Sequence, residues 1–165
     1  MSCGYISNWD ELFMRHAYLI ARKSKDPRTH IGAVLVKNKT IFSEGYNGFP
    51  REVKDDEERY NNRETKLKFV AHAELNAIIN AARIGVSTWF STMYTQSVPC
   101  NECAKAIINA GIVMVTVHSA WKDSLFWKEP EEITKTMFRE AGINIKIFER
   151  KLGLRGFCDG QSIRV

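Results

Sequence analysis

His72-Ala73-Glu74 is the first of two segments on which the architecture of this chain depends, and Pro99-Cys100-Asn101-Glu102-Cys103 is the second. Each stands at the start of a predicted helix, where unpaired N–H groups and partial positive charge stabilise thiolates. Cys100 and Cys103 are three residues apart, so both sulfur atoms lie on one side of their helix. One predicted helix and one predicted strand separate the segments, a connection that brings two neighbouring helix starts together.

The two segments supply three zinc ligands with a carboxylate beside them. His72, Cys100 and Cys103 are ligands of the kinds that zinc prefers, and a catalytic zinc keeps a fourth position open for water. No ligand-like spacing to this set is found for the remaining histidines and cysteines, which are Cys3, Cys158, His16, His30 and His118. The pattern predicts an open zinc site, with Glu74 free to move protons. A structural zinc knuckle or a redox cysteine pair stays as an alternative, although a redox pair leaves His72 and Glu74 without a role. Glu102 is interpreted as a first-turn acid of its helix.

Length and composition predict a single domain over residues 1–165, since the chain can bury a proper core and is 44% hydrophobic. We expect neither a secretion signal, since the first residues show no charged stretch followed by an apolar one, nor a membrane-spanning segment, since no apolar run is long enough. Sparse cysteines favour a reducing compartment, and we expect a cytoplasmic location, or the host cytoplasm if a virus encodes the chain. The net charge of +5 suits anionic ligands such as nucleotides, but it does not argue for a nucleic-acid groove.

Hydrophobic periodicity predicts an α/β fold with the element order α-β-β-α-β-α-β-α-β. The predicted helices cover residues 8–24, 71–83, 100–110 and 131–140, and glycines follow the last three. The predicted strands cover residues 31–36, 89–95, 112–117 and 143–148, with a further strand opening at residue 40. Alternation after the first hairpin implies a mixed sheet with helices on both faces. The tail from residue 149 is expected to be irregular.

Two polar connections interrupt this pattern. Gly45-Tyr46-Asn47-Gly48-Phe49-Pro50 holds two glycines around Asn47, which allow unusual backbone angles and close approach to a ligand. An ordinary turn is the alternative reading. Residues 51–68 contain six bases and six acids, so this insertion is neutral and is expected to form a solvated helix or an ordered lid. Most of its side chains are expected to be plain surface, and a ligand-lining role for one or two stays open.

Hydrolytic deamination is the chemistry that this set of residues favours. Histidine, glutamate and the Pro-Cys-x-x-Cys segment match the signature of zinc-dependent nucleobase deaminases. The hypothesis is that water activated by zinc attacks an amidine-type carbon such as C4 of cytosine. Glu74 takes a proton from the water, gives it to the ring nitrogen and later passes a proton to the departing ammonia.

A family resemblance rests on motifs within residues 31–148. They are Ile31-Gly32-Ala33-Val34-Leu35-Val36, Gly45-Tyr46-Asn47-Gly48-Phe49-Pro50, His72-Ala73-Glu74-Leu75-Asn76-Ala77-Ile78 and Pro99-Cys100-Asn101-Glu102-Cys103-Ala104-Lys105. With these motifs the sequence resembles the deoxycytidylate (dCMP) deaminases of the cytidine-deaminase superfamily. The resemblance implies a three-layer α/β/α fold with a five-stranded mixed sheet. It also implies conversion of dCMP to dUMP for thymidylate synthesis by a homohexamer that dCTP activates and dTTP inhibits.

The resemblance also implies roles for individual residues. Zinc would be bound by His72, Cys100 and Cys103, with Glu74 as the proton shuttle. Asn47 would contact the sugar, Arg28 would meet the 5′-phosphate, and backbone groups of Ala73 and Val98 would read the base. Effector sensing and substrate gating would fall to Gly45, Tyr46, Gly48, Phe49, Trp121 and Lys122, although Trp121 could equally be a packed core aromatic. Some family members carry a second, structural zinc in the insertion, but residues 51–70 hold neither Cys nor His, so we expect one zinc.

Competing readings are a tRNA adenosine deaminase, a single-stranded DNA cytosine deaminase and a catalytically silent nucleotide-binding subunit. The first two need a basic or aromatic surface that follows a nucleic-acid backbone, and the neutral insertion argues against one. The third is disfavoured because His72, Glu74, Cys100 and Cys103 are all present. The sequence therefore favours a small nucleotide as the partner, without nucleic acid or membrane.

Overall fold

The computed structural model describes residues 6–121 and 128–165. The helices are α1 (Trp9–Ala21), α2 (Glu57–Asn61), α3 (Arg63–Phe69), α4 (Ala73–Arg83), α5 (Asn101–Asn109), the 3-10 turn η1 (Ser119–Trp121) and α6 (Lys128–Glu140). The strands are β1 (Gly32–Lys37), β2 (Thr40–Tyr46), β3 (Thr92–Thr95), β4 (Met114–His118), β5 (Asn144–Phe148), β6 (Arg155–Cys158) and β7 (Gln161–Arg164). In the described part of the chain no helix is both long and apolar enough to cross a membrane.

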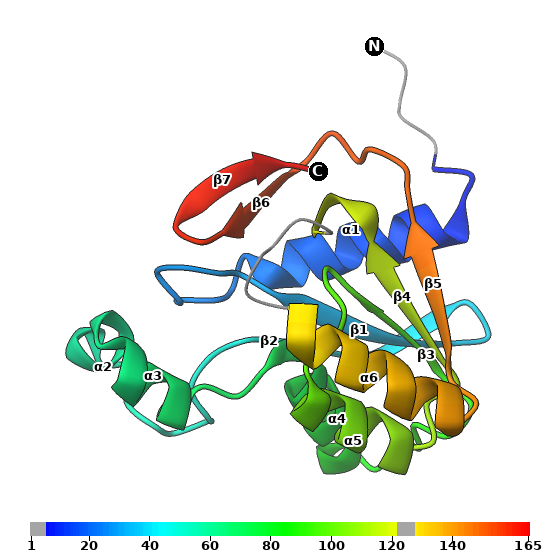
Figure 1. Cartoon of the computed structure of the whole chain (residues 1–165), viewed down its shortest axis with the longest axis horizontal. Helices are drawn as coiled ribbons and strands as arrows, with labels where there is room; N and C mark the ends of the chain where they lie inside the picture. The colour runs from blue at the N-terminus through cyan, green and yellow to red at the C-terminus, as the bar shows by residue number, and fades with distance from the viewer. Residues whose placement is uncertain (1–5, 122–127) are drawn as a thin grey trace.

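The main sheet has the strand order β2-β1-β3-β4-β5 and separates two helical layers. Strand β1 pairs antiparallel with β2 and β3, whereas β3, β4 and β5 are parallel. Figure 1 shows α4, α5 and α6 on one face of this sheet and α1 on the other. The predicted α/β fold, a five-stranded mixed sheet between helical layers, is confirmed.

Strand β1 shows why both faces are covered. Its alternate residues Ala33 and Leu35 join the core beneath α4, α5 and α6, while Val34 and Val36 join the core beneath α1. Because successive side chains of a strand point to opposite faces, a nearly continuous apolar run is buried on both sides. Helices α4, α5 and α6 are followed by Gly85, Gly111 and Gly142, which all have positive φ, as the sequence predicts.

The two glycines around Asn47 do not provide unusual backbone angles, so that expectation is wrong. Neither Gly45 nor Gly48 has a positive φ. Gly45 lies in β2 and is needed for space, because a Cβ there would be 2.4 Å from the Ala77 backbone nitrogen of α4. At Gly48 a Cβ would meet its nearest neighbour at 3.5 Å, an ordinary contact.

One predicted element boundary and the prediction for the tail are also wrong. The strand expected from residue 89 begins at Thr92, because Trp89 and Phe90 form an exposed turn in which Phe90 has a φ of 59°. The tail expected to be irregular contains the hairpin β6–β7, whose turn is Asp159-Gly160. Leu152 and Val165, which flank the hairpin, are buried in the α1 core, and this burial holds the tail in place.

Candidate metal centre and substrate pocket

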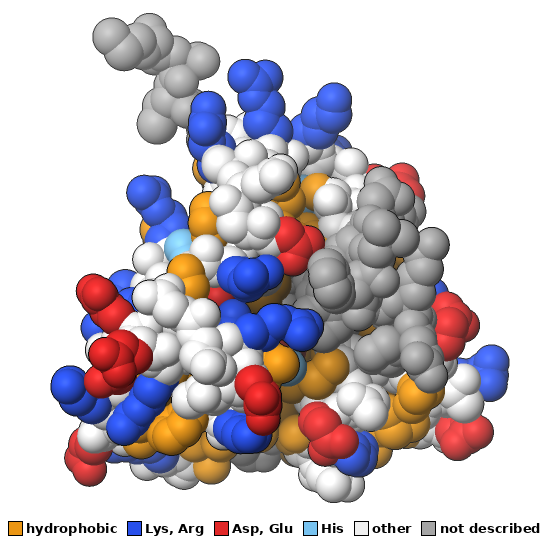
Figure 2. Space-filling view, turned by 60° about the vertical axis from the view of Figure 1, so that its left-hand side comes forward, with side chains coloured by type: hydrophobic (Ala, Val, Ile, Leu, Met, Phe, Trp, Pro, Cys, Tyr) orange, Lys and Arg blue, Asp and Glu red, His pale blue; other side chains and the backbone are white. Residues whose placement is uncertain are grey.

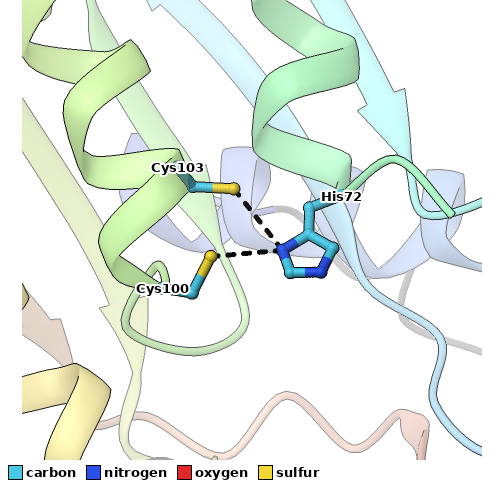
Figure 3. Close-up of side chains that lie close together, drawn as sticks. All are labelled: His72, Cys100 and Cys103. Atoms are coloured by element: carbon cyan, nitrogen blue, oxygen red, sulfur yellow. Dashed lines mark hydrogen bonds between the residues drawn. The ribbon is translucent and has the colours of Figure 1, made fainter. Parts of the chain in front are cut away.

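The starts of α4 and α5 bring the predicted ligands together. His72 is the N-cap residue of α4 and Cys100 is that of α5, and the two helices pack side by side (Figure 3). The Nδ1 atom of His72 lies 3.3 Å from Cys100 Sγ and 3.5 Å from Cys103 Sγ. All three ligand atoms lie within 4.8 Å of one another. His72 and Cys100, which are 28 residues apart in sequence, therefore belong to one cluster.

The spacing of these atoms fits a tetrahedral zinc ion. Zinc bonds of about 2.0 Å to nitrogen and about 2.3 Å to sulfur place two such ligands roughly 3.5 Å apart. The measured Nδ1 to Sγ distances of 3.3 and 3.5 Å agree with this value. Within the described residues the group comprises three side chains, His72, Cys100 and Cys103. Three ligands leave one corner of a tetrahedron for water, the arrangement of a catalytic zinc.

Hydrogen bonds within the cluster shift the pKa values of His72 and Cys100. The hydrogen bond to Cys100 raises the pKa of His72 to about 9. The hydrogen bond from Cys103, together with that from His72, lowers the pKa of the Cys100 thiol well below its usual range. Both shifts arise from hydrogen bonds within the cluster. A zinc ion replaces the protons of these hydrogen bonds, since its ligands must be thiolate and neutral imidazole.

Glu74 lies beside the cluster and is 4% exposed. Its Oε2 is 3.7 Å from Cys103 Sγ, and its Oε1 accepts a hydrogen bond of 3.4 Å from the hydroxyl of Thr95 in β3. Burial raises the pKa of the Glu74 carboxyl. A carboxyl group with a raised pKa holds a proton more readily near neutral pH, which suits a group that has to accept and return protons.

A pocket of about 310 Å³ opens over this cluster. Its lining includes His72, Glu74 and Cys100 at the metal end, and Arg28 and Asn47 elsewhere. The other lining residues are Asp26, Thr29, Ile31, Arg63, Lys66, Leu67, Val70, Ala73, Ser97, Val98 and Asp159. Figure 2 shows Lys and Arg side chains beside a hollow on one face of the molecule. The pocket therefore combines a metal-binding end, an apolar wall and basic groups.

Of the residues predicted to contact substrate, Arg28, Asn47, Ala73 and Val98 line this pocket. Asn47 is 8% exposed, and its side chain is engaged by the backbone: Oδ1 accepts from Ile31 N, and Nδ2 donates to Thr29 O, both at 2.8 Å. Asn47 thus holds the segment that follows Arg28. The structure gives it a positioning contact that the sequence did not indicate.

Of the residues predicted for effector sensing and gating, those that the structure describes are not among the lining residues. Gly45 and Tyr46 belong to β2, Gly48 pairs with Ala71, and Phe49 stacks on Tyr60 of α2 with ring centroids 4.1 Å apart. Trp121 is 7% exposed and donates its indole N–H to the Tyr18 hydroxyl at 2.8 Å. Trp121 is thus packed in the core, which is the alternative to a gating role that the sequence analysis left open. Lys122 lies outside the described residues.

Sequence reasoning missed several residues of the site. Thr95, which is fully buried beside Glu74, carried no signal beyond its strand. Arg63 and Lys66 line the pocket from the charged insertion, where nothing in the local pattern separates a pocket residue from a surface residue. Asp159 belongs to an Asp-Gly pair, a hairpin turn signal that could have placed the C-terminal hairpin, though not its contact with the pocket.

Comparisons with known proteins agree with this geometry. Residues 7–119 match the model of the cytidine and deoxycytidylate deaminase zinc-binding region. Deoxycytidylate deaminase of Mus musculus is 39% identical over 149 residues, which cover 87% of this chain and 81% of that protein. The Homo sapiens deoxycytidylate deaminase is 38% identical over 146 residues, covering 85% of this chain and 79% of that protein.

A solved structure with the same fold is the dCMP deaminase of the cyanophage S-TIM5 in complex with dCMP and dUMP. It superposes with a TM-score of 0.70 at 25% identity, covering 88% of this chain and 100% of that chain. The chain described here belongs to the cytidine and deoxycytidylate deaminase family. The family resemblance seen in the sequence and the prediction that the chain is a deaminase are both confirmed.

Proposed function

We propose that this enzyme hydrolyses dCMP to dUMP and ammonia with one zinc ion per chain, and that the dUMP supplies thymidylate synthesis. The observation that carries the proposal is a pocket with the His-Cys-Cys cluster and buried Glu74 at one end and basic side chains at its edge. Relatives named deoxycytidylate deaminase and the solved relative that holds dCMP and dUMP support the same substrate.

In this proposal His72, Cys100 and Cys103 hold the zinc. When bound, zinc lowers the pKa of a coordinated water to about 7 and so supplies a nucleophile for C4 of the cytosine ring. Glu74 accepts a proton from the attacking water and delivers it to the ring nitrogen. It then carries the second proton to the amino group, the C–N bond breaks, and ammonia leaves as the C4 carbonyl forms. The raised pKa of Glu74 supports this exchange.

The substrate is oriented by the rest of the lining. The base lies against Ile31 and Val98, with backbone groups of Ala73 and Val98 at its polar edge. Asn47 retains one amide hydrogen and one lone pair beyond its two backbone bonds, and these can meet the sugar. Arg28 is exposed at the pocket, and its planar guanidinium can bind the 5′-phosphate through two hydrogen bonds.

Regulation by dCTP and dTTP and assembly into a homohexamer belong to the same proposal. Gly45, Tyr46, Gly48 and Phe49 connect β2 with the insertion helices, because Phe49 packs on both Tyr60 and Phe69. An effector bound at this connection would act on α3, whose residues line the pocket. A gating role is proposed for Lys122, whereas Trp121 is buried and donates to the Tyr18 hydroxyl, which gives it a packing role.

The test is turnover of dCMP, dCTP, CMP and deoxycytidine by the zinc-loaded protein, each with and without dCTP or dTTP. We expect stoichiometric dUMP and ammonia from dCMP, loss of activity after chelation and its return with zinc. A tRNA anticodon loop containing adenosine serves as the control substrate. Failure of the zinc-loaded protein to convert dCMP, or conversion of the tRNA adenosine in its place, would refute the proposal.

A further inference from the structure

Three basic side chains line the substrate pocket, and two of them come from the insertion. Arg28 follows α1, whereas Arg63 and Lys66 both lie on α3. Residues three apart on a helix share one face, so α3 presents Arg63 and Lys66 to the pocket together. Figure 1 shows α2 and α3 set apart from the helices that cover the sheet. Because α3 does not pack on the sheet, its position at the pocket depends on the contacts that its side chains make with other segments.

One such contact is a buried ion pair between Lys66 and Asp26. Lys66 Nζ lies 3.0 Å from Oδ1 and 2.8 Å from Oδ2 of Asp26, and the two side chains are 8% and 5% exposed. A buried charge is tolerated only when a partner and hydrogen bonds satisfy it. Asp26 therefore neutralises the positive charge of Lys66. Lys66 is thus a positioning residue and does not bind the substrate itself.

The same carboxylate also holds the Arg28 segment. Oδ1 of Asp26 accepts hydrogen bonds from the backbone N–H groups of Arg28 at 2.8 Å and of Thr29 at 3.2 Å. On the other side of this segment, Gly160 N in the C-terminal hairpin donates to Arg28 O at 2.8 Å. Asp26 thus connects the segment that carries Arg28 with the helix that carries Arg63.

Arg28 and Arg63 differ from Lys66 in being exposed and uncompensated. Among the side chains that the structure describes, in residues 6–121 and 131–165, neither guanidinium takes part in an ion pair, although both line the pocket. One exposed carboxylate, Asp159, also lines the pocket, so these three side chains carry a net charge of +1. An arginine pair attracts a phosphate dianion and presents planar donors that match its oxygens.

We infer that Arg63 is a second phosphate-binding residue, which binds the 5′-phosphate together with Arg28, and that Lys66 positions it through Asp26. This inference rests on the proposed dCMP activity and assigns the insertion a function in substrate selection. The insertion helix α3 recognises the phosphate of the nucleotide, while the cluster at α4 and α5 acts on the base.

The first test is Arg63→Gln in the full-length, zinc-loaded enzyme. We expect KM for dCMP to rise about tenfold or more, the effect of losing a charge-assisted hydrogen bond, with kcat little changed. Turnover of deoxycytidine, which lacks the phosphate, should be unaffected. The matched control is Lys68→Gln, which removes one positive charge from the same helix at an exposed residue paired with Glu64. An equal KM for dCMP in the Arg63 and Lys68 variants would overturn the inference.

The second test separates positioning from direct binding. Lys66→Gln should raise KM for dCMP while deoxycytidine turnover persists, and Lys66→Arg should largely restore the wild-type value. In the Arg63→Gln background Lys66→Gln should add less than it does alone, because the two act through one contact. Calorimetric titration with dUMP and deoxyuridine gives the same comparison without catalysis. Full additivity, or an equal loss for the ligands without phosphate, would contradict the positioning role.

Failure of the inference can be told apart from failure of the proposed function. If the wild-type protein converts dCMP but Arg63→Gln matches the Lys68→Gln control, only the phosphate role of Arg63 is lost. If the wild-type protein with zinc does not convert dCMP at all, the proposed function fails and the inference fails with it.

Discussion

The two ends of the pocket are built in different ways. At the metal end, Glu74 and Cys103 are buried, and all the groups stand in the first turns of two helices packed on the sheet. At the other end, the guanidinium groups of Arg28 and Arg63 are exposed on peripheral segments that one buried ion pair connects. In the proposed mechanism, the groups that break the C–N bond are held by the core, whereas the groups that select the substrate are held by a few contacts between peripheral segments. Changes at the metal end should abolish chemistry, and changes at the other end should alter selectivity.

The largest expected effect belongs to the metal end. Glu74→Ala should lower kcat for dCMP about a thousandfold, the usual contribution of a general acid–base group, while zinc remains bound. Metal content by atomic absorption and dCMP loss by ultraviolet absorbance check both statements. The control is Glu102→Ala, which removes an exposed acid of α5 paired with Lys105. Unchanged activity in Glu74→Ala, or an equal loss in the Glu102 variant, would defeat the assignment.

An intermediate effect is expected where the core supports the metal end. Gly45→Ala would place a Cβ 2.4 Å from the Ala77 nitrogen and push α4 from the sheet. Such overpacking should lower the free energy of unfolding by about 1–3 kcal/mol. Gly48→Ala is the matched control, since the nearest atom to its Cβ would be 3.5 Å away. Denaturant titration compares the two variants, and equal stability would show that close packing of β2 and α4 is not required.

The smallest effect is expected at the phosphate end. Asp159→Asn removes an exposed negative charge from the pocket lining, so the phosphate of dCMP should bind more tightly. We expect KM for dCMP to fall about two- to threefold, since solvent screens an exposed charge, with deoxycytidine unaffected. Initial-rate measurements at low and high salt check this, and the difference should shrink at high salt. A rise in KM would mean that Asp159 assists binding.

The same contrast explains what the sequence can predict. The metal end is encoded by short motifs, and the spacing of His72, Cys100 and Cys103 within them is enough to indicate a shared site. The run at residues 31–36 likewise indicates a strand buried on both faces, because its apolar residues are almost continuous. Both features can be predicted because each depends only on residues that are close together in the sequence or on the spacing of a short motif.

The other end could not be predicted because it depends on contacts between distant segments. Lys66 and Asp26 are 40 residues apart, and neither differs in its local sequence from a surface charge. The turn at Trp89 and Phe90 resembles a strand in sequence, since aromatic residues favour strands even where they stand exposed. Only the packed chain shows which charges are buried and which face the pocket.

The division between the two ends is tested most directly by the ratio of kcat/KM for dCMP to kcat/KM for deoxycytidine, measured on the zinc-loaded wild-type enzyme. If two arginines bind the phosphate while the zinc cluster and Glu74 act on the base, the ratio should be about a hundred or more. A ratio near one, or faster turnover of deoxycytidine, would contradict the account.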